Sequence, residues 1–95
     1  MTEPNSSPPT RVFLVEDDPA IATIAQQGME DLGYAVIGPY AAAEDAIAAL
    51  PKIHPPPDVV LMDINLTGAM DGIEATEIIG RDFGLPVVYA RALQD

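Results

Sequence analysis

The stretch VVLMDINLTGAMDGIE, residues 59–74, joins an apolar run to a carboxylate and then to a polar turn. The run 59–62 is short and rich in β-branched residues, which predicts a buried strand. Asp63 ends that run, although a carboxylate at the end of a buried strand loses solvation unless a positive charge meets it. The segment therefore predicts a strand whose last residue binds a cation or takes part in chemistry.

Strands and helices alternate around this segment. The patterns predict four apolar strands, at 12–15, 34–38, 59–62 and 85–90, and three helices, at 19–32, 41–50 and 72–83. Asp18 before Pro19, and Asp71 three residues before Glu74, are typical helix starts. This alternation predicts an α/β fold, a parallel sheet with helices on both faces.

Helical periodicity also predicts which side of each helix faces the sheet. For the first helix the expected apolar side consists of Ile21, Ile24, Ala25, Gly28 and Leu32. For the second it consists of Ala43, Ala46, Ile47 and Leu50. For the third it consists of Ile73, Thr76, Ile79, Gly80 and Phe83.

Carboxylates follow two of the predicted strands. Glu16 and Asp17 come directly after the first strand, and Asp63 ends the third. Functional residues of open parallel sheets lie beyond the carboxyl ends of the strands, so these three side chains are expected to converge. Converging carboxylates raise one another's pKa unless a divalent cation compensates them, and Mg²⁺ prefers hard oxygen ligands of this kind.

Composition narrows the classes of function. The 95 residues carry 15 acidic and 4 basic side chains and a net charge of −11, which argues against nucleic acid or an anionic membrane as the direct ligand. There is no cysteine, and a single histidine makes a zinc site a poor interpretation. We expect a disordered leader at 1–10, one domain at 11–95, and, because no signal or membrane segment is apparent, a cytoplasmic protein.

Two other motifs compete for Asp63. Asp63, Asn65, Thr67, Gly68 and Glu74 nearly satisfy an EF-hand Ca²⁺ loop, but the preceding PKIHPPPDVVLM is rich in proline and β-branched residues and cannot be the entering helix. The run 63–67 also resembles the nucleophile motif of haloacid-dehalogenase-like phosphatases. In that reading Asn65 replaces the general acid/base, and an amide cannot shuttle a proton.

A third resemblance uses both acidic strand ends. Glu16-Asp17, Asp63 and the loop NLTGAMDG resemble the receiver domains of two-component response regulators, from about Arg11 to Ala90. The resemblance implies a flavodoxin-like fold and a signalling domain rather than an enzyme. It implies that Asp63 accepts a phosphoryl group from a histidine kinase or phosphotransfer protein. It also implies Mg²⁺ held by Asp17 and Asp63, by Glu16 through water, and by the backbone carbonyl of Asn65.

The sequence departs from the receiver pattern after its fourth strand. Arg91 occupies the position where the family has a Ser or Thr, and the family's lysine on a fifth strand has no counterpart. We therefore expect an incomplete (βα)3β receiver without helix four, strand five and helix five, with impaired signalling output. Its uncovered fourth strand predicts a homodimer or exchanged assembly. An interaction module with an idle phosphorylation site remains the alternative.

Overall fold

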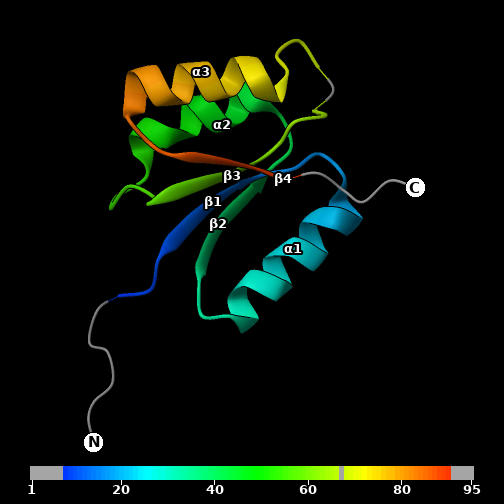
Figure 1. Ribbon diagram of the computed structural model, residues 1–95, viewed down its shortest axis with the longest axis vertical. Helices are drawn as coiled ribbons and strands as arrows, with labels where there is room; N and C mark the ends of the chain where they lie inside the picture. The colour runs from blue at the N-terminus through cyan, green and yellow to red at the C-terminus, as the bar shows by residue number, and fades with distance from the viewer. Residues whose placement is uncertain (1–7, 67, 91–95) are drawn as a thin grey trace, which may run out of the picture.

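A computed structural model of the chain describes residues 8–66 and 68–90, and it has the expected α/β architecture (Figure 1). The four strands are parallel and lie in the order β2-β1-β3-β4. They are β1 (Arg11–Val15), β2 (Ala35–Tyr40), β3 (Val59–Asp63) and β4 (Val87–Ala90). The helices are α1 (Pro19–Asp31), α2 (Ala43–Ala49), the short 3-10 turn η1 (Leu50–Lys52) and α3 (Gly72–Phe83).

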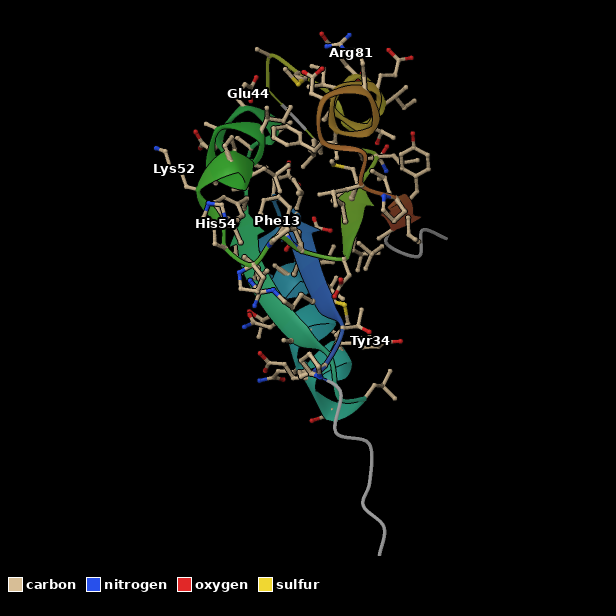
Figure 2. All side chains as sticks on the ribbon, turned by 90° about the vertical axis from the view of Figure 1, so that its left-hand side faces the viewer. Phe13, Tyr34, Glu44, Lys52, His54 and Arg81 are labelled. Carbon is tan, nitrogen blue, oxygen red and sulfur yellow. The ribbon has the colours of Figure 1, made fainter. Side chains whose placement is uncertain are left out.

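Helices α2 and α3 cover one face of the sheet, and α1 lies on the other (Figure 1). The main core forms under α2 and α3, where alternate strand residues point. Phe13 stacks on Tyr40 there, with ring centroids 4.9 Å apart, and Figure 2 shows Phe13 between the sheet and the helical layer. The core also contains Val15, Val60, Met62, Ala43, Ala46, Leu50, Ala75 and Ile79.

The structure corrects the predicted side of α1. Ile24 and Leu32 are 72% and 79% exposed, and the residue that α1 buries is Ala22. The helix begins as expected, because Asp18 accepts hydrogen bonds from the amides of Ala20 and Ile21 at 2.9 and 3.2 Å. Periodicity identifies an apolar stripe but not which flank of it meets the sheet, and the small Ala22 lets the helix approach closely.

The predicted side of α3 is correct in part. Ile79 is buried and Phe83 packs against the core, but Ile73 is 55% exposed and Gly80 is exposed, whereas Ala75 is buried. Asp71 caps the helix by accepting from the amide of Glu74 at 2.8 Å. Ile73, in the first turn after that cap, faces outward.

The second helical segment agrees with its prediction more closely. It begins two residues later than expected, at Ala43, and its predicted inner residues Ala43, Ala46 and Leu50 are buried. Among the described residues, no helix has the length and apolar character needed to cross a membrane.

Candidate metal and phosphoacceptor site

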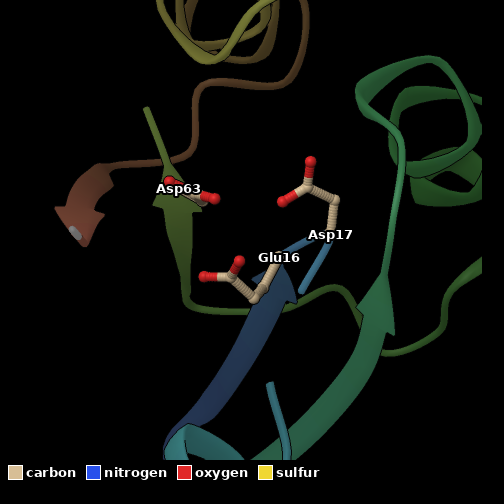
Figure 3. A group of neighbouring side chains, drawn as sticks. All are labelled: Glu16, Asp17 and Asp63. Atoms are coloured by element: carbon tan, nitrogen blue, oxygen red, sulfur yellow. The ribbon is translucent and has the colours of Figure 1, made fainter. Parts of the chain in front are cut away.

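Three carboxylates meet where β1 and β3 end (Figure 3). Oxygen atoms of Glu16, Asp17 and Asp63 all lie within 4.8 Å of one another. Glu16 and Asp63 are each only 7% exposed, and Asp17 is half-buried. The adjacent, parallel pairing of β1 with β3 brings these residues together, as their places after the two strands lead one to expect.

Backbone contacts hold Glu16 in place. Its amide donates to the carbonyl oxygen of Tyr40 at 2.9 Å, and its Oε2 accepts from the amide of Asp18 at 3.1 Å. The end of β2 reaches Glu16 through an irregularity in the β1–β2 register, near Gly38, whose φ is +108°. Glycine adopts this conformation without the steric cost that other residues have.

Asp63 is held from two sides. Its Oδ1 accepts from the amide of Asn65 at 2.9 Å, which fixes the carboxylate at the start of the loop. The first residue of α3, Gly72, packs against the same backbone. A Cβ on Gly72 would lie 2.5 Å from the carbonyl oxygen of Asp63 and 2.8 Å from the Cα of Ile64, so a larger residue would displace the loop.

The sequence placed Gly72 only in the receiver-like loop that leads into the third helix, with no packing role. A glycine directly after a helix-capping aspartate was the available signal, but the close approach that requires it appears only when α3 packs onto the end of β3.

Burial and crowding raise the pKa of Glu16 from 4.5 to about 7. Burial is the largest cause, and a hydrogen bond with Asp63 and the charges of Asp63 and Asp17 add to it, against the opposing hydrogen bond from the Asp18 amide. Near neutral pH the cluster therefore favours a proton on Glu16 or a cation beside it.

The donor set fits a hard divalent cation. Mg²⁺ binds oxygen at about 2.0–2.1 Å, so two oxygens on one ion are at most about 4.2 Å apart. The 4.8 Å spread of the three carboxylates requires only a small inward rotation, or one ligand that acts through water. The carboxylates of Glu16, Asp17 and Asp63 could hold such an ion.

The described basic residues lie toward the amino ends of the strands, away from the acidic cluster. Arg11 begins β1, Lys52 follows α2, and Arg81 lies in the last turn of α3, where it pairs with Asp82 at 2.9 Å. Figure 2 shows Lys52 and Arg81 on the outside of the helical layer. Arg91 and Thr67 lie outside the described residues.

The fold around Asp63 also separates the competing motifs. Residue 63 ends a β-strand, so the loop that follows is not entered from a helix as an EF-hand loop would be.

The sequence profile of the response regulator receiver domain matches residues 12–94. The chain belongs to the response regulator receiver domain family. Within this family the domain is mainly a signalling module rather than an enzyme.

Relatives of this receiver domain occur in different kinds of signalling protein. It is 38% identical over 88 residues to the DNA-binding response regulator MtrA of Mycolicibacterium smegmatis, covering 90% of this chain and 36% of MtrA. It is 40% identical over 75 residues to the sensor histidine kinase GacS of Pseudomonas protegens, covering 78% of this chain and 8% of GacS. The chain thus spans about a third or less of these relatives.

Solved structures agree on the fold. The signal receiver domain of a modulated diguanylate cyclase from Desulfovibrio desulfuricans superposes with a TM-score of 0.82 at 34% identity, over 90% of this chain and 67% of that one. The response regulator PhyR from Brucella abortus superposes with a TM-score of 0.76 at 36% identity, over 85% of this chain and 32% of PhyR. The flavodoxin-like receiver fold expected from the sequence is therefore confirmed.

Proposed function

We propose that this receiver domain accepts a phosphoryl group on Asp63 from a histidine kinase or a phosphotransfer protein in the cytoplasm. The observation that supports this proposal is the cluster of Glu16, Asp17 and Asp63, whose oxygens lie within 4.8 Å at the carboxyl edge of the sheet. The occurrence of related domains in both a sensor histidine kinase and a DNA-binding response regulator fits transfer between such proteins.

The same proposal assigns a Mg²⁺ ion to the cluster. Asp17 and Asp63 would bind it directly, Glu16 through water, and Asn65 through its backbone carbonyl. The hard oxygen donors and the raised pKa of Glu16 support this assignment, because a divalent cation relieves the repulsion that raises that pKa. When bound, the ion would offset the charge of the incoming phosphoryl group.

The position of Asp63 suits it to in-line attack. Its Oδ1 accepts a hydrogen bond from the amide of Asn65, and the proposal assigns the attack to Oδ2. An O–P bond forms to Oδ2 while the N–P bond of a phosphohistidine breaks, and the electron pair of that bond stays on the imidazole nitrogen. The nucleophile is a carboxylate, so no proton has to be removed from it, and the product is an acyl phosphate.

Intact mass spectrometry tests this function directly. The chain is incubated with acetyl phosphate and Mg²⁺, and we expect one phosphoryl adduct that is absent in Asp63→Asn and absent when Mg²⁺ is chelated. Asp71→Asn is the matched control, because Asp71 is a nearby helix cap and the side-chain carbonyl oxygen of asparagine can still accept the hydrogen bond from the Glu74 amide. An adduct that persists in Asp63→Asn, or no adduct on the folded chain, contradicts the proposal.

A second candidate is an interaction module in which the acidic site is idle. The observation that favours it is the position of β4 at the end of the described sheet, with Val88 and Tyr89 54% and 47% exposed. An unpaired strand edge can pair with the edge of a second copy, giving a homodimer or an exchanged assembly. Sedimentation that shows a dimer, together with no adduct at Asp63, would favour this candidate.

A further inference from the structure

Strand β2 carries an extra residue just before the acidic cluster. The register between the paired strands advances from Phe13 to Val15 on β1, but from Ile37 to Tyr40 on β2. One residue more on one strand than on its partner is a β-bulge, and bulges are over-represented next to active sites, where they redirect a side chain. Figure 3 shows β2 ending beside the end of β1, which carries Glu16.

The bulge turns the side chain of Tyr40 into the main core. Ile37 and Tyr40 both pack against the core under α2 and α3, although an odd number of positions separates them along β2. In a regular strand two such side chains point to opposite faces of the sheet, so Tyr40 would face the α1 side. The extra residue changes that alternation, and the Tyr40 ring stacks on Phe13 with an interplanar angle of 27°.

The bulge also brings the backbone of Tyr40 to Glu16. The carbonyl oxygen of Tyr40 accepts a hydrogen bond from the Glu16 amide at 2.9 Å. The stacked ring of Tyr40 restrains the backbone of the same residue, and through it the backbone of Glu16. The buried carboxylate that follows has an oxygen within 4.8 Å of ligand oxygens of Asp17 and Asp63. The end of β2 therefore supports the acidic cluster without contributing a side chain to it.

The bulge requires a residue without a side chain at position 38. Gly38 has a φ of +108°, in the region that favours glycine. A Cβ on Gly38 would lie 2.8 Å from the carbonyl oxygen of Leu14 and 3.1 Å from the amide nitrogen of Tyr40. Both of these atoms belong to the backbone, so a larger residue would have to displace β1 close to Glu16, or displace Tyr40 itself.

We propose that Gly38 and Tyr40 are positioning residues, which hold Glu16 where it supports a divalent cation in the acidic cluster. Neither residue would contact the ion, because both act through the backbone of Glu16. The inference rests on the Mg²⁺ site of the proposed function and extends it to the strand that places one of the ligands. Gly72 has the corresponding place on α3, where a Cβ would meet the backbone of Asp63.

Mg²⁺ titration of the full chain tests the proposal, with the NMR amide shifts of Glu16 and Asp63 as the signal. Gly33→Ala is the matched control for Gly38→Ala, because Gly33 has a similar φ of +98° but a Cβ there meets nothing within 4 Å. Both variants carry the strain of alanine at positive φ, and only Gly38→Ala displaces β1. We expect Gly38→Ala to weaken Mg²⁺ binding about tenfold, and Gly33→Ala less than about twofold.

Hydrogen exchange without metal tests the positioning separately from Mg²⁺. We expect Gly38→Ala to lose protection at the Glu16 amide, whereas the amide of Ile79 in the core keeps its protection and shows that the chain is folded. Tyr40→Ala and Tyr40→Phe form a second pair that leaves the bulge residue unchanged. Tyr40→Phe keeps the ring that stacks on Phe13, so it should bind Mg²⁺ as the parent chain does, and Tyr40→Ala should bind it more weakly.

Three outcomes would overturn the inference. A Glu16 amide as well protected in Gly38→Ala as in the parent chain would mean that the bulge does not hold this residue. Equal Mg²⁺ affinities of Gly38→Ala and Gly33→Ala, on a parent chain that binds the ion, would contradict this inference alone. A parent chain that binds no Mg²⁺ would contradict the metal site of the proposed function and this inference together.

Discussion

The two faces of this sheet differ in how well they are covered, and β3 shows the difference within one strand. Val60 and Met62 point toward α2 and α3 and have 0% exposure, whereas Leu61 between them lines a groove of about 350 Å³ that the described residues leave on the α1 face. The strand is equally apolar on both sides, so the difference arises from the helices. The face under α2 and α3 is therefore expected to supply most of the stability.

The largest predicted effect compares neighbours on β3. Met62→Ala should lower the free energy of unfolding by about 2–5 kcal/mol, because it leaves a cavity in a fully packed core. Leu61→Ala should lower it by about 1 kcal/mol, because part of that side chain already contacts solvent. Urea denaturation measures both. Equal losses would mean that the groove is covered in solution.

A second pair of substitutions compares the two ends of α3. Gly72→Ala should cost about 1–3 kcal/mol, because its Cβ would overlap the carbonyl oxygen of Asp63. Gly80→Ala should instead stabilise by about 0.5–1 kcal/mol, because its Cβ meets open space in a helix.

Thermal unfolding shows which of the two alanine variants is the more stable. Mg²⁺ titration shows whether Gly72→Ala also weakens Mg²⁺ binding at the acidic site. If Gly72→Ala proved as stable as the parent chain, the tight packing of α3 onto the end of β3 would be wrong.

The acidic edge should make stability depend on pH when no metal is bound. The pKa of Glu16 is about 7 in the folded chain and near 4.5 in the unfolded chain, so the folded chain binds more protons between those values. Its contribution to stability is fully present below pH 4.5 and is lost as the pH rises through 7. We expect a loss of about 1–3 kcal/mol across that range.

Urea denaturation in a chelator at about pH 5 and about pH 8 measures this slope. Glu16→Gln should flatten it, and Mg²⁺ should restore stability at the higher pH. If the unfolding free energy of Glu16→Gln had the same slope against pH, other titrating groups would be the cause of the pH dependence.

The smallest predicted effect compares the two helix caps. Asp18→Ala and Asp71→Ala should each cost about 1 kcal/mol, because each removes a carboxylate that accepts amide hydrogen bonds in the first turn. Hydrogen exchange should show a greater loss of protection in α1, which buries only Ala22, than in α3. The matching Asn variants retain an acceptor and should lose less. Equal fraying of the two helices would contradict the difference between the faces.

Local signals predicted the elements better than they predicted the contacts. The strand at 59–63, the caps at Asp18 and Asp71 and the buried side of α2 depend on a few neighbouring residues, and the structure agrees with them. The inward sides of α1 and α3 were predicted partly wrongly at Ile24 and Ile73. Those sides depend on how each helix is rotated against a sheet that periodicity does not describe.

The candidate site was likewise predictable from the sequence only in part. The positions of Glu16, Asp17 and Asp63 after predicted strands were sufficient to expect their convergence, because parallel strands end at one edge. The role of Gly72 was not predictable, since it depends on the close approach of α3 to the backbone of Asp63, where a Cβ would lie 2.5 Å from the carbonyl oxygen, and these segments meet only in the folded chain. The assignments of Asn65 and Arg91 stay predictions.

The sequence by itself determined the order of strands and helices, the acidic strand ends and the excess of negative charge, because these follow from residue type and spacing. Only the tertiary structure decided which strands pair and which side of each helix is buried, and that the described residues leave a groove over β3 and β4. Those features depend on long-range packing, in which small residues such as Ala22 and Gly72 allow whole elements to approach closely.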